Sequence, residues 1–201
     1  LNSVVCPDER TCYIVGGAPF IGGNGIILKT TNGGDSWIRQ TIPTTNPLRG
    51  ISCATRDFCY AAGDAGALLK TINGGAAWST LGAFSPAAEQ FYWDVAAADA
   101  SNVTAVGNAG VVYRTTNGGA AWTRVISNTS ENLHSVHFAN GAIGWIAGTG
   151  GKVLKTINGG LSWLSLSTPA GINGLHSISS SGNKLWVGGD EHEPRGIQDA
   201  V

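Results

Sequence analysis

Hydrophobic residues fall in short runs along this chain, and glycine-rich turns separate the runs. No stretch has the spacing of an amphipathic helix, whereas short apolar runs bounded by turn residues are typical of strands. Each unit of roughly 42 residues holds four such runs, a period that belongs to propeller blades or solenoid repeats. The runs that open the units lie at 1–5, 48–52, 92–96, 133–137 and 175–179.

The third run of each unit leads into an Asn-Gly-Gly corner, and a tryptophan follows five residues after the Asn. Asn-Gly tolerates positive φ, and the Asn side chain can bond amides of its own turn. The Trp is expected to close the gap between neighbouring sheets. Phosphate-binding glycine loops are disfavoured because no helical pattern follows any Gly-Gly pair. The repeated residues are Asn32 and Trp37, Asn73 and Trp78, Asn117 and Trp122, and Asn158 and Trp163.

These units predict an all-β fold, a β-propeller of four-stranded antiparallel blades in a single domain over residues 1–201. The predicted blades are 1–40, 48–81, 91–126, 133–166 and a partial fifth over 175–201. The fifth unit has neither the corner nor the Trp, so about 4.5 blades are present and the remaining blades of a larger propeller are expected from missing sequence.

The four cysteines form two pairs at the same place in the repeat, namely Cys6 with Cys12 and Cys53 with Cys59. A zinc site is disfavoured because the pairs sit a whole repeat apart and lack well-placed histidines. Two disulfides that each close a hairpin are favoured over four reduced core cysteines. The disulfides imply an oxidising compartment, so an extracellular, cell-surface or periplasmic location is expected.

Charge and hydropathy exclude several classes of partner. The net charge is −1 and only 12% of residues are charged, which gives no electrostatic case for nucleic acid. No apolar run approaches the roughly 20 residues of a membrane-spanning helix. The chain opens at Leu1 without a Met, so the N-terminus is expected to be processed or cut. No cofactor and no metal are expected.

The corner resembles the Asp-box, or BNR repeat, Ser/Thr-x-Asp-x-Gly-x-x-Trp, with Asn in place of the Asp. Together with the A/V-G-x-x-G turn and the K/R-T-x-x-G-G-x-x-W hairpin, the chain looks most like the photosystem II stability/assembly factor-like propellers. That resemblance implies a scaffold that binds a protein. Similar repeats also occur in sialidases, xyloglucan-degrading enzymes and sortilin-type receptors, so a carbohydrate-active enzyme or a lectin-like module that binds glycan stays open as an alternative.

Catalytic chemistry is poorly represented on the predicted inner strands. Asp94 is the only acid at such a position, and one carboxylate does not make a glycosidase. We therefore favour Asp94 as a polar residue lining the central channel, with its aromatic neighbours packed between blades. His134 and His176 occupy one repeat position, which Asn2, Arg49 and Trp93 share, and all five are expected to line the channel rather than to hold a metal.

One cation precedes each corner, and these are Lys29, Lys70, Arg114 and Lys155. A solvated side chain whose stem covers apolar surface is favoured over a basic arc that docks an acidic partner, because a docking site would not need every blade.

We expect an exported, non-catalytic module whose partner binds on one face of the disc. Two expanded turns, 17–24 and 189–195, share that face with the linkers between blades, and variable loops on a rigid scaffold usually carry binding. Exposed apolar groups there would await a partner. The candidate binding residues are Phe20, Ile21, Phe84, Phe91, Trp93, Asp190, Glu191 and His192.

Overall fold

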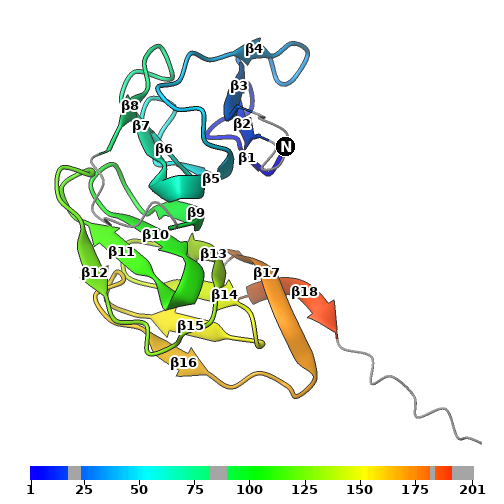
Figure 1. The fold of residues 1–201 in the computed structure, drawn as a ribbon. Coiled ribbons are helices and arrows are strands. Elements are labelled where there is room, and N and C mark those ends of the chain that lie inside the picture. Colours follow the sequence, from blue (N-terminus) through cyan, green and yellow to red (C-terminus); the bar gives the residue numbers. More distant parts are fainter. Residues whose placement is uncertain (18–23, 82–89, 182–183, 192–201) are drawn as a thin grey trace, which may run out of the picture.

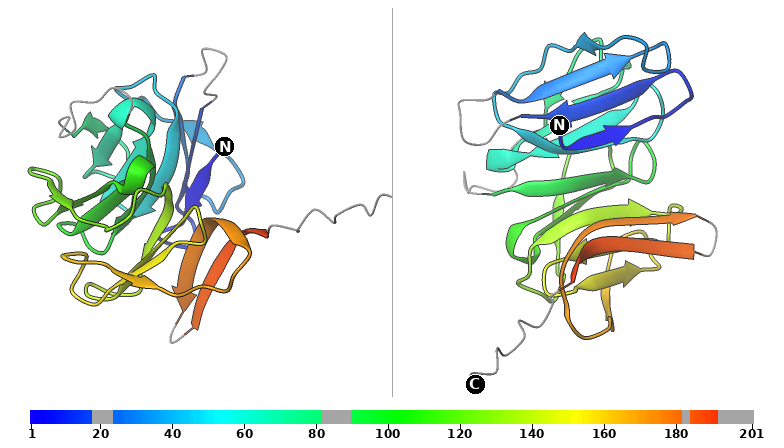
Figure 2. Two further views of the ribbon diagram at one scale, coloured as in Figure 1. Left: turned by 60° about the horizontal axis from the view of Figure 1, so that its bottom comes forward. Right: turned by 90° about the vertical axis from the view of Figure 1, so that its right-hand side faces the viewer.

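The computed structural model describes residues 1–17, 24–81, 90–181 and 184–191. Over these residues the chain forms four four-stranded sheets and one two-stranded sheet. Figures 1 and 2 show the sheets following one another around an arc in sequence order, from blue to orange. The predicted all-β propeller of antiparallel blades is confirmed. None of the described helical turns has the length or apolar character to cross a membrane.

Each complete blade takes its strands in sequence order, and all neighbouring strands are antiparallel. Short 3₁₀ turns, η1 (Asp64–Gly66) and η2 (Asn108–Gly110), join the second and third strands of blades 2 and 3. Blade 1 holds β1 (Ser3–Val5), β2 (Cys12–Gly16), β3 (Ile26–Thr30) and β4 (Ile38–Arg39). Blade 2 holds β5 (Leu48–Cys53), β6 (Cys59–Gly63), β7 (Leu68–Thr71) and β8 (Ser79–Thr80). Blade 3 holds β9 (Tyr92–Ala97), β10 (Val103–Gly107), β11 (Val112–Thr115) and β12 (Thr123–Val125). Blade 4 holds β13 (Leu133–Phe138), β14 (Gly144–Gly148), β15 (Val153–Thr156) and β16 (Leu164–Leu166), and blade 5 holds β17 (Ile172–Ser181) and β18 (Lys184–Glu191).

The hydrophobic core is divided among the junctions between blades. Each of four buried clusters draws its residues from two consecutive blades. Trp78 of blade 2 packs edge-on against Tyr13 of blade 1, with ring centroids 6.3 Å apart. Trp163 of blade 4 joins the cluster that contains Val112 of blade 3. Trp78 and Trp163 therefore fill the space toward the preceding blade, which is the position expected for them.

The corner is held by two side chains, a Thr and the predicted Asn. In blade 2 the Thr71 hydroxyl accepts the amide N–H of Gly75 at 2.8 Å and donates to Asn73 Oδ1 at 2.9 Å. Asn73 Oδ1 also accepts the amide N–H of Ala77 at 2.9 Å. The other three corners repeat these bonds, and both glycines of every corner have positive φ.

The cation before a corner reaches into the next blade. Lys29 Nζ donates to the carbonyl oxygen of Gly74 at 2.7 Å, and Lys70 Nζ donates to that of Gly118 at 2.8 Å. Arg114 makes the same contact with the Gly159 carbonyl. Our expectation of a solvated cation is wrong at these three positions, because the positive-φ glycines of the next corner turn a carbonyl toward the cation.

Lys155, the fourth member of the set, lies 6.0 Å from the centre of the Trp145 ring. No hydrogen bond joins its ammonium group to any part of the chain that the structure describes.

The two predicted disulfides, Cys6–Cys12 and Cys53–Cys59, are confirmed. Each closes the loop between the first and second strands of its blade. The equivalent positions in blade 3 form the ladder pair Ala97 and Val103. In blade 4 the Phe138 ring packs so closely over Gly144 that a Cβ there would lie 2.7 Å from it. Apolar packing thus replaces the disulfide in these two blades.

The fifth blade departs from the prediction after Gly188. β18 continues to Glu191, so Gly189 pairs with Leu175 and Asp190 pairs with Gly174 instead of lying in an expanded turn. The reason is that β17 begins at Ile172, three residues before the predicted strand, and supplies a partner for these residues. Residues 192–195 of the predicted turn, and 18–23 of the other one, lie outside the described residues.

Replacing Lys70 by Met should lower the free energy of unfolding by about 1.5–3 kcal/mol, because a hydrogen bond from a charged group into blade 3 is lost. Lys155→Met is the matched control, since it removes an equivalent cation without that bond, and should cost under about 0.5 kcal/mol. Urea denaturation with the disulfides intact measures both. Equal losses for the two variants would show that the bond to the next blade contributes nothing.

Candidate binding site at the axial opening

Each inner strand presents one equivalent residue to the axis of the disc. Asn2, Arg49, Trp93, His134 and His176 line a single cavity of about 610 Å³, as their shared repeat position predicts. The cavity lies where the inner strands begin, directly after the linkers between blades. The turn at Asp64 bonds the linker carbonyl of Pro47, and the turn at Gly66 bonds that of Gln90. The mouth of the cavity therefore opens on the face formed by turns and linkers.

Four of these side chains form a continuous series across blades 2 to 5. The Arg49 guanidinium lies 4.2 Å from the centre of the Trp93 ring. Trp93 meets His134 edge-on with ring centroids 5.0 Å apart, and His134 lies 5.1 Å from His176. Planar groups at these spacings attract one another through cation–π and aromatic contacts. We call Arg49, Trp93, His134 and His176 the axial series.

Two turn residues, Asp64 and Asn108, and Asp190 of β18 hold three members of the axial series in place. Arg49 forms a two-point ion pair with Asp64, and Trp93 Nε1 donates to Asn108 Oδ1 at 2.6 Å. His176 Nε2 lies 2.9 Å from Asp190 Oδ2. Each partner directly follows the glycine at the end of a second strand, so one repeat position anchors the other.

His134 breaks this pattern. The equivalent turn residue, Thr149, donates its hydroxyl to Glu131 instead, at 2.6 Å. Within the described part of the chain the His134 ring makes no hydrogen bond. Burial, with a smaller contribution from His176, lowers the pKa of His134 below its ordinary value. At neutral pH the ring is therefore uncharged, and neither of its nitrogens is hydrogen-bonded to the described chain.

The Asp94 carboxylate links blade 3 to blade 4 through hydrogen bonds. Its carboxylate accepts the amide N–H of Val95 at 2.8 Å, that of Val136 at 3.0 Å and the hydroxyl of Ser135 at 3.1 Å. A Cβ on Gly50 of blade 2 would lie 2.5 Å from it, so the glycine makes room for the carboxylate. Burial raises the pKa of Asp94 to about 6, although these hydrogen bonds oppose the change.

Asp94 and the aromatic residues beside it lie where the sequence analysis expects them. Asp94 lines the axial cavity, and Tyr92 packs against Tyr113 in a cluster between blades, as predicted. Trp93 also lines the cavity, where it contacts Arg49 of blade 2 and His134 of blade 4. No second Asp or Glu is among the described residues that line this cavity.

Several of the predicted binding residues meet at this opening. Trp93 belongs to the axial series, the Phe91 ring lies 5.7 Å from the Arg49 guanidinium, and Asp190 holds His176. Glu191 ends β18. Phe20, Ile21, Phe84 and His192 fall outside the described residues.

The sequence analysis places Arg49 at the channel but misses its anchor, Asp64. The signal was present, because Asp64, Asn108 and Asp190 all follow the glycine of a second strand. Among the described residues, no three His, Cys, Asp or Glu side chains are grouped as a metal would require.

A sequence model of the family described as photosynthesis system II assembly factor YCF48 matches residues 16–134, more than half of the chain. The chain belongs to this family. The match begins at the last residue of β2 in blade 1, covers blades 2 and 3 and ends in β13 of blade 4, and it includes Arg49, Trp93 and His134 of the axial series. A search of curated proteins gave no match.

Solved structures of YCF48 share the fold. YCF48 from Cyanidioschyzon merolae has a TM-score of 0.66 at 18% identity, and the match covers 92% of this chain and 62% of that one. A structure described as YCF48 bound to D1 peptide has a TM-score of 0.53 at 19% identity, and covers 92% and 74% respectively. An ancestral GH74 enzyme has a TM-score of 0.70 at 21% identity, covering 96% of this chain but 28% of the enzyme. At these identities the likeness concerns the fold.

Asp94→Asn should make stability less dependent on pH. The pKa of Asp94 is about 6 in the folded protein, above the ordinary value of 3.8, so the folded state binds this proton more tightly than the unfolded chain does. The wild type therefore loses stability through this group as pH rises from about 4 to about 6. Between pH 4 and pH 6 the unfolding free energy of the variant should therefore rise relative to that of the wild type by on the order of 2 kcal/mol. Urea denaturation at intervals from pH 4 to 7 tests this, and a constant difference contradicts it.

Proposed function

We propose that this chain is a non-catalytic assembly or scaffold propeller that binds an extended segment of a partner protein at the axial opening. The observation that carries the proposal is the axial series, in which Arg49, Trp93, His134 and His176 lie side by side at the mouth of one cavity. Rigid planar groups provide contact area at low cost in conformational entropy, and Trp and Arg are enriched at the energetic centres of protein interfaces.

The geometry of the opening suits a peptide. Asp64, Asn108 and Asp190 fix three members of the axial series, so little side-chain entropy is lost when a ligand binds. His134 has no such partner and can exchange hydrogen bonds with a peptide group. Membership of the YCF48 family supports this function, as does the YCF48 structure whose description records a D1 peptide.

The carbohydrate alternatives receive less support. A glycosidase requires two carboxylates across the bond that it cleaves. Asp94 is the acid found in the cavity, and its carboxylate already accepts three hydrogen bonds, two of which join blades 3 and 4. A lectin would stack a sugar on an open aromatic face. One face of Trp93 is instead occupied by the Arg49 guanidinium at 4.2 Å.

We also propose that the protein acts outside a reducing cytosol. The support is the pair of hairpin disulfides in blades 1 and 2, since such bonds persist in oxidising compartments.

His134→Ala tests the proposed site, because the ring can be removed without breaking any described hydrogen bond. The probe is a set of fluorescein-labelled peptides that tile the D1 protein, and fluorescence anisotropy measures their binding to the oxidised protein. We expect at least one peptide to bind and the variant to bind it at least fivefold more weakly, or by about 1 kcal/mol. Arg49→Gln should weaken the same peptide further, since Arg anchors contribute strongly to interfaces.

His137→Ala is the control. His137 lies on the same strand but is bonded to Ser180, away from the axial cavity, so peptide affinity should not change. The proposal fails if no D1 peptide binds the wild type, or if His134→Ala and His137→Ala have the same effect on affinity.

A further inference from the structure

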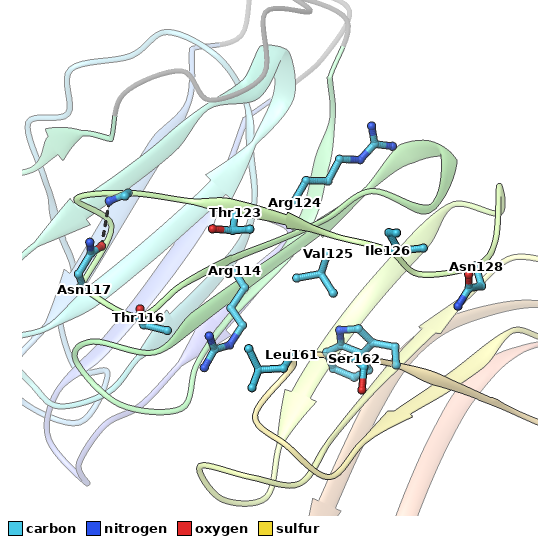
Figure 3. A pocket seen from close by; sticks show the side chains of 12 residues that line it. Arg114, Thr116, Asn117, Thr123, Arg124, Val125, Ile126, Asn128, Leu161 and Ser162 are labelled. Atoms are coloured by element: carbon cyan, nitrogen blue, oxygen red, sulfur yellow. Dashed lines mark hydrogen bonds between the residues drawn. The ribbon is translucent and has the colours of Figure 1, made fainter.

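A second surface stands out on the outer rim of the disc, at the groove between blades 3 and 4. Figure 3 shows its walls, which come from β12 and the residues after it on one side and from the corner of blade 4 on the other. The groove has a volume of about 540 Å³. Two large apolar side chains stand open in it, with Ile126 77% exposed and Leu161 65% exposed. We call this surface the rim groove.

The repeat does not require either of these side chains. Leu161 occupies the corner position that holds Ala76 in blade 2 and Ala120 in blade 3. Ile126 corresponds to Thr41 in blade 1 and Ser167 in blade 4. Blades therefore form without an apolar residue at either position, and exposed apolar groups that a fold does not need are candidates for contact with a partner.

The rim groove is also positively charged. Arg114 and Arg124 line it, and no Asp or Glu is among its described lining residues. Arg114 donates to the Gly159 carbonyl and to Asn102 Oδ1. Arg124 makes no hydrogen bond or ion pair with the described chain, and Figure 3 shows its side chain extending away from the ribbon. Because the whole chain has a net charge of −1, this pair of arginines is a local feature.

The backbone beside the groove can pair with another strand. β12 is the outermost strand of its sheet, paired with β11 on one side. An edge strand has a row of backbone donors and acceptors that an extended peptide can join.

We propose that the rim groove is a second docking site, separate from the axial opening, for an extended acidic segment of a partner protein. An apolar side chain of that segment lies between Ile126 and Leu161, and a carboxylate pairs with Arg124. Complementary charge selects an acidic segment over a basic one and speeds its association. A propeller with binding sites at both its axis and its rim can hold two segments at once, which suits a scaffold.

The repeat itself supplies the test variants. Leu161→Ala introduces the alanine that blades 2 and 3 have at this position. Arg124→Thr introduces the threonine that blade 2 has at the equivalent position, Thr80, so neither substitution should impair folding. The control is Leu164→Ala, which removes an equally exposed leucine of blade 4 that does not line the groove. The probes are a nonapeptide of alternating leucine and aspartate and its counterpart with lysine in place of aspartate, titrated into ¹⁵N-labelled protein.

We expect the acidic peptide to shift the amide signals of 124–126 and 161–162, and the lysine peptide to leave them unchanged. The Leu161→Ala, Arg124→Thr double variant should bind the acidic peptide at least tenfold more weakly, while Leu164→Ala and His134→Ala should bind it as the wild type does. The His134→Ala result separates this site from the axial one. The proposal is overturned if neither peptide binds, if both bind equally, or if the shifts arise elsewhere. It is also overturned if the groove signals depend on protein concentration without peptide, since a second copy of the chain would then be the occupant.

Discussion

No blade of this protein can bury both faces of its sheet alone, and the rest of the structure depends on that constraint. The four buried clusters sit at the junctions, where apolar side chains of two blades interdigitate. The hydrophobic effect is not directional, so further contacts must fix the orientation of one blade relative to the next. The corner supplies them, because its Thr and Asn shape a loop that places a Trp toward the preceding blade and offers that blade's cation a carbonyl.

The residues at the axial opening can vary because the packing between blades does not depend on them. The four members of the axial series face the cavity and belong to none of the junction clusters, so repeats can differ there without losing their packing. This chain uses the freedom to place Asn, Arg, Trp, His and His at one repeat position. Asp64, Asn108 and Asp190, which share another repeat position, then stabilise Arg49, Trp93 and His176. A scaffold of nearly identical blades thereby presents a surface that differs from one blade to the next.

The sequence was sufficient to predict the features that recur in every repeat or that depend on residues close together in the chain. Repetition of the corner located the blades, and the spacing of Cys6 and Cys12 within one hairpin predicted their disulfide. It was insufficient where the contact joins residues far apart. Lys70 and Gly118 are 48 residues apart, and only the stacking of blades brings them together. The prediction that Asp190 lies in an expanded turn was wrong for a related reason, since the extension of β18 depends on the length of β17. Leu161 was visible as a departure from the repeat, but its exposure depends on how blades 3 and 4 meet.

The contact between cation and carbonyl makes the first three junctions heterologous. The cation always belongs to the earlier blade and the carbonyl to the later one, so the array has a polarity like that of a chain of head-to-tail subunits. Within the described blades the series begins at the corner of Asn32 in blade 1, whose backbone matches the corners that accept a cation, and it ends at Lys155 in blade 4. A blade inserted in reverse would break this order and place two cations or two carbonyls against each other.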